Sequence, residues 1–335
     1  MKQYSYKDNP IKVFGVVDFE EKNELRRLPE ELIEKMPHLS KQGRRCPGAR
    51  IGFRTNSENI KIRVTFETLE VDVGMSVYAC QSVAVYAGDR PASRFLGLVS
   101  PQNYEQKVFE GTVTKEKTLE DITLWLPRNE IITDIEIWLD DEAQMLPPTP
   151  YKYAKPILYY GSSITEGACA ESVTNGYNAI ISRHLDVDYY NFGFSGNARG
   201  EQEMADYISK IDMSVFVYDY DHNAPTEAYL AETHEPFFKR IRERNPELPI
   251  VMMTRPEAGV DTNKERREIV RTTYENAIQA GDKNVYFIDG NRFFGNSDRE
   301  ICLVDGIHPN DIGFYKMASV VEPVVQAILE KLCSK

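Results

Sequence analysis

The chain has 335 residues, of which 41% are hydrophobic and 27% are charged, a composition typical of a globular protein and a length that suits two domains. Its formal net charge is −12, which argues against a nucleic acid or an anionic membrane as the main partner, because both attract a basic surface. No apolar run approaches the roughly 20 residues of a membrane span, and the N-terminus lacks the apolar segment of a signal peptide. We therefore expect no membrane contact and a cytoplasmic location, unless a signal has been trimmed away.

The first part of the chain shows the alternation of apolar and polar side chains that is typical of strands. Residues 60–66 and 135–139 alternate, and residues 76–86 and 122–126 are further strand candidates. Alternation over several short segments predicts an antiparallel β-sandwich of jelly-roll type in residues 1–146. One short helix is expected over residues 30–36. The proline-rich residues 147–150 predict an extended linker over 147–155.

From residue 156 to residue 335, strand and helix patterns alternate. The expected strands are 157–160, 187–192, 214–218, 250–254 and 285–288, and the expected helices are 177–185, 202–211, 226–244, 263–280 and 312–332. This order predicts a parallel sheet with helices on both faces, that is, a three-layer α/β/α domain. Ligands of such sheets bind at the carboxyl ends of the strands, and every motif below lies at such an end or in the loop before the last helix.

The first expected strand of this domain ends in Gly161-Ser162-Ser163. Gly161 allows a sharp turn, and Ser163 would then lie at the N-terminus of a helix, where free backbone N–H groups can bind a developing oxyanion. Taken alone, the two serines could equally be caps of that helix. The hydroxyl of Ser163 becomes a candidate nucleophile only if a base is brought to it from elsewhere in the chain.

Asp305 and His308 supply that base and its partner. They lie three residues apart on a turn bounded by Gly306 and Pro309, directly before the last helix. A serine nucleophile needs an adjacent base, and the base needs a group that holds its imidazole in one tautomer. We therefore predict that Ser163 is the nucleophile, His308 the general base and Asp305 the residue that orients His308.

Two other strand ends offer donors for an oxyanion. Gly196 has no side chain, so its backbone N–H can come close to a substrate, and Asn223 can donate from its side-chain amide. The backbone N–H of Ser163 is the third predicted donor. Ser195 is a second and poorer candidate for the nucleophile, because residues 193–197 lack the last glycine of a G-x-S-x-G elbow.

The sequence does not predict a metal site. The five cysteines are odd in number, widely spaced and without a Cys-x-x-Cys pair, which favours structural thiols in a reducing compartment: Cys46, Cys80, Cys169, Cys302 and Cys333. Asp219, Asp221 and His222 are close together, but their spacing in a loop resembles no well-defined metal signature. We expect neither a metal nor an organic cofactor.

The segments that contain Ser163, Gly196, Asn223 and the pair Asp305 and His308 follow one another in an order that resembles the SGNH (GDSL-like) hydrolase superfamily of esterases and lipases. The resemblance covers about residues 156–332. The family's Gly-Asp-Ser, glycine, Gly-x-Asn and Asp-x-x-His blocks match residues 161–163, 195–196, 221–223 and 305–308. The resemblance implies Ser163 as nucleophile, Gly196 and Asn223 as oxyanion donors, and Asp305 with His308 as the remaining pair. Ser162 replaces the usual Asp and Asp221 the usual Gly, which alters the expected pocket lining. With a β-rich N-terminal domain, the chain looks like the bacterial two-domain branch that includes carbohydrate esterases.

The motifs and the resemblance together predict a serine esterase that works through an acyl-enzyme. The branch it resembles implies a small acyl group such as acetyl on a sugar, so the expected partner is a small-molecule or oligosaccharide ester. Aromatic faces stack on sugars, so the expected contacts are Tyr160, Tyr220, Tyr218 and Phe194, with Ser162 and Asp221 beside them. Two alternatives remain: a lipase or thioesterase for longer acyl chains, and a non-catalytic carbohydrate-binding protein. The sequence does not predict the oligomeric state.

Overall fold

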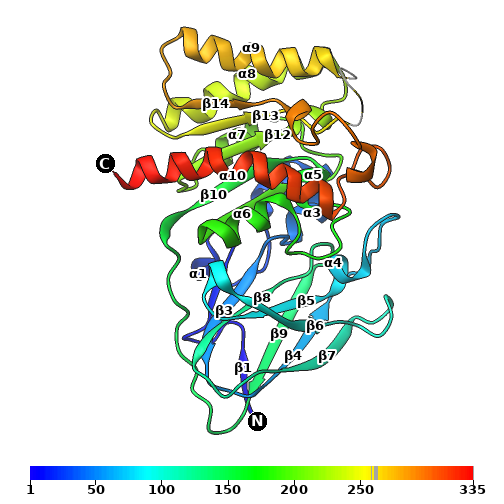
Figure 1. The fold of residues 1–335 in the computed structure, drawn as a ribbon, viewed down its shortest axis with the longest axis vertical. Helices are drawn as coiled ribbons and strands as arrows, with labels where there is room; N and C mark the ends of the chain where they lie inside the picture. Colours follow the sequence, from blue (N-terminus) through cyan, green and yellow to red (C-terminus); the bar gives the residue numbers. More distant parts are fainter. Residues whose placement is uncertain (258, 260–262, 335) are drawn as a thin grey trace.

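The computed structural model describes residues 1–257, 259 and 263–334. A β-rich N-terminal region lies at one end of the long axis and an α/β region at the other (Figure 1). Two antiparallel sheets form the N-terminal region. The first has the strand order β1 (Lys2–Ser5), β9 (Ile132–Leu139), β4 (Asn59–Phe66), β7 (Val108–Thr114), and the second has the order β2 (Lys12–Phe14), β3 (Arg50–Thr55), β8 (Glu120–Trp125), β5 (Val83–Ala87), β6 (Arg94–Val99).

The alternation of side chains decides which face of these sheets is buried. In β4, Ile60, Ile62 and Val64 are fully buried, whereas the polar residues between them are partly exposed. Ile62 of β4 pairs with Ile137 of β9, so apolar side chains line up on one face of this sheet. They form one core with apolar residues of the opposite sheet, among them Phe53. The predicted antiparallel sandwich is confirmed.

One predicted strand in this region is partly wrong. Residues 76–86 were expected to be extended, but Val77–Gln81 form the short helix α4 and only the following segment is strand β5. Ala79, Cys80 and Gln81 are buried in succession. A helical turn allows this, whereas a strand sends consecutive side chains to opposite faces. The other helices of this region are α1 (Phe19–Lys22), α2 (Glu30–Lys35) and α3 (Ser40–Arg44), of which only α2 was predicted.

The α/β region contains a five-stranded parallel sheet, as predicted. Its order is β11 (Val187–Gly193), β10 (Tyr153–Gly161), β12 (Val215–Asp219), β13 (Ile250–Met253), β14 (Val285–Ile288). Strand β10, the first of these strands along the chain, begins at Tyr153, which lies within the predicted linker 147–155. Thr149 of that linker is held by Asp121 of β8, to which its backbone N–H donates at 2.7 Å.

Helices cover both faces of this sheet and complete the three-layer α/β/α arrangement. One buried cluster joins the sheet to α6 (Tyr177–Leu185) and α10 (Asp311–Cys333). A second joins the other face to α7 (Gln202–Ile208), α8 (Glu227–Arg244) and α9 (Lys264–Gln279). In Figure 1, α6 and α10 lie in front of the sheet, and α8 and α9 lie at the end away from the sandwich.

Helix α10 is more apolar than the sequence analysis suggested. Among the described helices it is the one long and apolar enough to cross a membrane by length and composition, which corrects the expectation that no segment approaches this limit. Its apolar stripe, including Met317, Val321 and Val325, is buried in the core. Packing against the sheet accounts for the high hydropathy of this helix.

The two regions share buried surface on both sides of the sheet. Ala84 and Trp125 of the sandwich belong to the same core cluster as α6 and α10. Leu28, Leu32 and Ile33, in and before α2, belong to the cluster with α7 and α8. The N-terminal region therefore forms part of the core of the α/β region. It is not a loosely tethered accessory module.

A buried histidine in this core predicts sensitivity to acid. His234 of α8 is 1% exposed and lies beside the ring of Tyr218, and burial lowers its pKa from 6.5 to about 3. Below pH 6.5 the imidazole of His234 is protonated in the unfolded chain but stays neutral in the folded protein. The free energy of unfolding therefore falls as the pH is lowered from 6.5 toward 3. We expect the wild type to lose about 2 kcal/mol more unfolding free energy between pH 7 and pH 5 than His234→Asn.

Urea unfolding of both proteins at the two pH values measures this difference. Asparagine preserves a polar atom that can meet the Thr273 hydroxyl, which lies 2.9 Å from Nδ1 of His234. Equal losses in the two proteins would show that His234 does not resist protonation in the folded state.

Candidate active site

The candidate site lies where the strand order changes direction. Strand β10 is between β11 and β12, so the chain crosses to one side of β10 after the strand and later returns to its other side. Such a switch point leaves a crevice at the carboxyl ends of the strands. Strand β10 ends at Gly161, and the four-residue helix α5 (Ser163–Glu166) follows at once.

The two serines have different hydrogen-bond partners. The hydroxyl of Ser162 accepts a hydrogen bond from the backbone N–H of Ile164 at 3.1 Å, so Ser162 is the N-cap of α5. The hydroxyl of Ser163 is not used for capping. It lies 2.8 Å from Nε2 of His308, and Ser163 is 7% exposed.

A continuous hydrogen-bonded chain connects Ser163, His308 and Asp305. Nδ1 of His308 lies 2.7 Å from Oδ2 of Asp305, on the side of the ring opposite Ser163. Oδ1 of Asp305 accepts from the backbone N–H groups of Ile307 and His308 at 3.0 and 2.8 Å. These bonds fix the turn that carries the two side chains, so the spacing of three residues becomes a direct contact.

The electrostatics of this turn favour a charged Asp305. Partial burial raises its pKa, but the hydrogen bonds from the backbone and ring of His308 and from Ile307 outweigh burial and lower the pKa to about 2. A carboxylate beside Nδ1 favours the tautomer in which Nδ1 carries the proton. Nε2 is then free to accept the proton of the Ser163 hydroxyl, as general-base activation requires.

The predicted oxyanion donors come from three loops at the same end of the sheet. Within the described residues, the backbone N–H groups of Ser163 and Gly196 have no hydrogen-bond acceptor. Gly196 has φ +70°, and a Cβ added there would meet nothing within 4 Å, as expected for a residue at an open edge. Oδ1 of Asn223 accepts from the backbone N–H of Ala198 at 3.3 Å, which leaves the amide NH₂ of Asn223 as a donor.

The partners of Ser195 argue against it as the nucleophile. Its hydroxyl and its backbone N–H both donate to Oε2 of Glu166, the N–H at 3.1 Å. The available nitrogen of His308 is bonded to Ser163 instead. The hydroxyl of Ser195 therefore has a carboxylate partner and no contact with the candidate base.

The aromatic residues expected to contact a sugar are in the core, which corrects that prediction. Tyr160 and Tyr220 are 1% and 0% exposed. The Tyr160 hydroxyl accepts from the N–H of Gly200 at 2.9 Å, and the Tyr220 hydroxyl lies 2.9 Å from that of Thr233. Tyr218 and Phe194 are also fully buried. Parallel strands buried on both faces take apolar residues at every position, so aromatic residues near a strand end need not face the cleft.

The two polar residues expected beside the substrate are also buried. Ser162 and Asp221 are each 1% exposed. Burial raises the pKa of Asp221 to about 6, and its Oδ2 accepts from the backbone N–H of Arg255 at 3.3 Å. Asp221 thus links the turn that precedes Asn223 to the backbone at Arg255.

His222 lies beside the candidate site, but from the sequence it was weighed only as a metal ligand. His222 lies with Nδ1 2.8 Å from the guanidinium of Arg255, and burial, with the charge of Arg255, lowers its pKa to about 3. No group of three or more His, Cys, Asp or Glu side chains within the described residues could hold a metal ion. Arg255 lies just after strand β13 and belongs to no recognisable sequence motif. Its contact with His222 arises from the fold and could not be predicted from the sequence.

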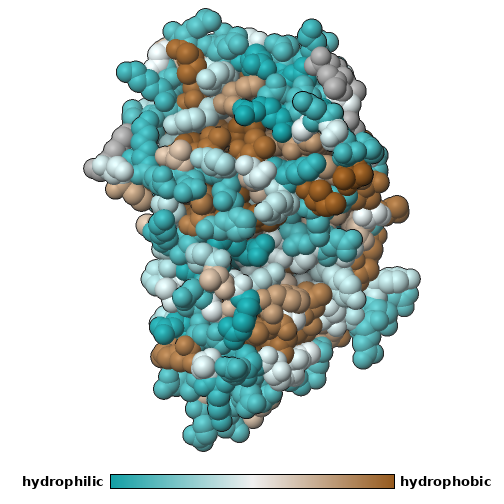
Figure 2. Space-filling model, in the orientation of Figure 1, coloured by the Kyte–Doolittle hydropathy of each residue, from teal (hydrophilic) through white to brown (hydrophobic). Residues whose placement is uncertain are grey.

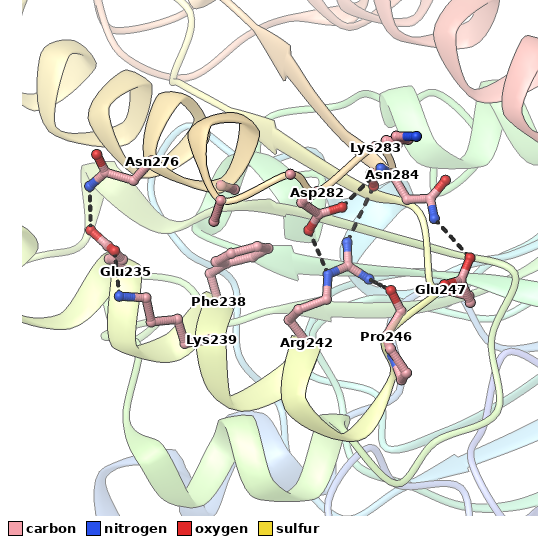
Figure 3. A pocket seen from close by; sticks show the side chains of 13 residues that line it. Glu235, Phe238, Lys239, Arg242, Pro246, Glu247, Asn276, Asp282, Lys283 and Asn284 are labelled. Carbon is pink, nitrogen blue, oxygen red and sulfur yellow. Dashed lines mark hydrogen bonds and ion pairs between the residues drawn. The ribbon is translucent and has the colours of Figure 1, made fainter.

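Two large hollows lie away from Ser163. Figure 3 shows one of about 510 Å³ near the ends of α8 and α9. There Arg242 donates to Asp282 at 2.8 Å and to the carbonyl of Pro246 at 3.2 Å, so its guanidinium is already occupied. Another, of about 690 Å³, includes Tyr153 and Ser214, before or at the amino ends of strands. Both are at the edge of the sheet opposite the triad and contain none of its residues.

Apolar side chains are exposed around the turn that carries His308. Ile301, Val304 and Ile307 are 52%, 49% and 41% exposed. Figure 2 shows apolar surface on the side of the α/β region where residues 290–310 lie in Figure 1. The rim of the candidate site therefore has apolar as well as polar character.

A parallel α/β sheet that presents a hydrogen-bonded serine, histidine and aspartate at its switch point has the arrangement that hydrolysis by a serine nucleophile requires. Residues 154–326 match the model of the GDSL-like lipase/acylhydrolase family, and residues 1–145 match the model for the N-terminus of SGNH-hydrolase-type esterases. The chain belongs to the GDSL-like lipase/acylhydrolase family, as its motifs predicted. No protein of curated function matches the sequence.

Solved structures share the whole architecture. A candidate GDSL-like lipase from Bacteroides ovatus is 25% identical with a TM-score of 0.88, and the match covers 98% of each chain. The salicylyl-acyltransferase SsfX3, from a tetracycline biosynthetic pathway, is 20% identical with a TM-score of 0.80, over 98% of this chain and 97% of that one. A family two carbohydrate esterase from Clostridium thermocellum, solved with cellohexaose, is 15% identical with a TM-score of 0.62, over 85% of this chain and 93% of that one.

Proposed function

We propose that this acylhydrolase cleaves a carboxylic ester through an acyl-enzyme on Ser163, and that its substrate is an acetylated carbohydrate. The observation that carries the proposal is the hydrogen-bonded order of Ser163, His308 and Asp305, with distances of 2.8 and 2.7 Å. The carbohydrate part is supported by the fold shared with the Clostridium thermocellum carbohydrate esterase.

Acylation begins when Oγ of Ser163 attacks the carbonyl carbon and its proton passes to Nε2 of His308. The oxyanion that forms receives hydrogen bonds from the backbone N–H groups of Ser163 and Gly196 and from the amide of Asn223. Asp305 stabilises the imidazolium without accepting its proton. The carbon–oxygen bond to the alcohol then breaks, and His308 returns the proton to the leaving alcohol.

Deacylation repeats these steps with water. His308 takes a proton from water, the hydroxide attacks the acyl carbonyl, and the bond to Ser163 breaks as His308 protonates its oxygen. The products are a carboxylic acid, an alcohol and the restored enzyme. Every proton and bond is accounted for by the three side chains, the ester and water.

A second candidate function is the hydrolysis of longer acyl esters. The exposed Val304 and Ile307, which directly precede Asp305 and His308, favour it because they could cover an apolar chain. Acetyl and octanoyl p-nitrophenyl esters separate the two functions. Acetylesterase activity predicts a higher kcat/KM for acetate, whereas a lipase or thioesterase predicts a higher value for octanoate.

Acetylated oligosaccharides test the substrate class directly. The proposal predicts that the protein removes acetyl groups, seen by mass spectrometry as stepwise loss of acetyl mass, and that Ser163→Ala does not. Turnover of p-nitrophenyl acetate without any loss of acetyl from a broad set of acetylated sugars would retain the esterase and reject the carbohydrate substrate. No turnover of any ester would favour a non-catalytic binding protein.

A further inference from the structure

Two buried arginines of the N-terminal region reach the short helix that carries Ser163. Arg27 and Arg128 are 3% and 4% exposed. Arg128 donates to the carbonyl of Gly167, at the C-terminal end of α5. Arg27 donates to Oε1 of Glu166, the last residue of α5, at 3.2 Å. Side chains from outside the α/β region therefore hold the element from which the nucleophile projects.

Glu166 extends this contact to the loop that carries Gly196. Its two carboxylate oxygens have different partners: Oε1 accepts from Arg27, and Oε2 accepts from the backbone N–H and the hydroxyl of Ser195. The side chain of Glu166 is 3% exposed, so these bonds are shielded from water. Ser195 directly precedes Gly196, and its orientation limits where the next backbone N–H points.

Arg27 is itself held rigidly. Its guanidinium donates to the carbonyls of Gln42 and Gly193, with one Gln42 contact of 2.7 Å, and lies 4.5 Å from the ring centre of Phe194. Gly193 and Phe194 lead from strand β11 into the Gly196 loop. One side chain thus contacts the strand end, the loop and the carboxylate on α5.

We propose that Arg27 and Glu166 are positioning residues that couple the N-terminal region to the oxyanion donors at Ser163 and Gly196. The N-terminal region is then part of the catalytic apparatus, beyond any role in binding carbohydrate. This inference rests on the proposed function, because it concerns the donors of that same site. Neither residue touches the substrate. Both act by fixing α5 relative to residues 195–196.

A purely structural role is the competing explanation, since breaking any buried ion pair weakens folding. Arg50 provides a matched control. It is fully buried, belongs to the sandwich, pairs with Asp188 of β11 and lies 4.5 Å from the ring centre of Tyr189. Within the described residues it has no hydrogen bond, ion pair or ring contact with α5 or with the Gly196 loop. Arg50→Lys therefore perturbs the same boundary between regions without reaching the site.

The experiment compares kcat, KM and thermal midpoint on p-nitrophenyl acetate for the full chain and its variants. Glu166→Gln and Arg27→Lys are expected to lower kcat about 100-fold with KM within about twofold, because a donor or nucleophile displaced by about 1 Å loses that much. Ser195→Ala removes one hydrogen bond to Glu166 and no charge, so we expect about a tenfold lower kcat with only a small fall in the thermal midpoint. Arg50→Lys is expected to lower the midpoint and leave kcat unchanged.

Coupling is tested by the double variant Glu166→Gln with Ser195→Ala. If the two residues act through one contact, the double variant has the same kcat as Glu166→Gln alone. Independent, multiplying losses would overturn the coupling. So would a wild-type kcat in Ser195→Ala, or an equal loss of kcat in Arg50→Lys.

The proposed function fails by a different result. If wild-type protein does not turn over p-nitrophenyl acetate, or if Ser163→Ala retains full turnover, the nucleophile is wrong. If the wild type is active and Ser163→Ala is not, but Arg27→Lys and Glu166→Gln fold and keep wild-type kcat, only the positioning role is wrong. Ser195→Ala keeps the test decisive should the two buried charge variants fail to fold.

Discussion

Replacing Ser163 with alanine is expected to lower kcat on an activated acetyl ester by about 10⁴-fold or more, with little change in the thermal midpoint. The side chain removed carries the only hydroxyl bonded to Nε2 of His308 within the described residues. Alanine fits the same helical position, and the N-cap bond from Ile164 to Ser162 stays in place. Initial rates from stopped-flow or plate assays, with circular dichroism for folding, measure both effects.

Ser195→Ala is the matched serine control for that prediction. Its hydroxyl donates to Glu166, so its loss is expected to cost about tenfold in kcat instead of removing the nucleophile. A Ser163→Ala protein with more than a tenth of wild-type activity, or a Ser195→Ala protein that is the more damaged of the two, would contradict the assignment.

Gly193→Ala is expected to disrupt the site strongly, because the added methyl group meets the main chain of α5. A Cβ at Gly193 would lie 2.1 Å from the backbone nitrogen of Glu166 and 2.5 Å from its Cα. These are main-chain atoms of α5, so the helix itself must move. We expect about 3 kcal/mol lower unfolding free energy from overpacking, and about 100-fold lower kcat because Ser163 moves relative to His308.

Gly281→Ala separates this packing effect from the general cost of losing a glycine. Gly281 has φ +87° and nothing within 4 Å of an added Cβ, so only the backbone strain of about 1–2 kcal/mol applies. Its kcat should equal that of the wild type. Urea unfolding and kcat for the two variants check the prediction, and a Gly193→Ala protein with wild-type stability and activity would show that α5 does not need this close approach.

The sequence predicted the parallel sheet, its helices and the three residues that the structure joins by hydrogen bonds, because these depend on local signals. Buried parallel strands are short apolar runs, and amphipathic helices separate them. Ser163 and His308 are 145 residues apart, yet each follows a strand end or precedes a helix, so the fold type alone brings them to one edge. A motif at a strand end is therefore informative before any coordinates exist.

The sequence did not predict which side chains face the cleft. Tyr160 and Tyr220 are at strand ends near Ser163, but their direction depends on packing against α8 and on contacts such as that of Tyr160 with Gly200. The link from Arg27 to Glu166 spans 139 residues and has no periodicity or motif. Such contacts arise from how the two regions pack, and local patterns contain no information about that packing.

The most direct test of the account is to locate the residue that a fluorophosphonate modifies. The reagent reacts with an activated serine hydroxyl, and digestion followed by mass spectrometry identifies the modified peptide. The account predicts one adduct, on Ser163, that is absent in Ser163→Ala and strongly slowed in His308→Ala. An adduct on Ser195 or another residue, or an active enzyme that the reagent neither modifies nor inhibits, would contradict it.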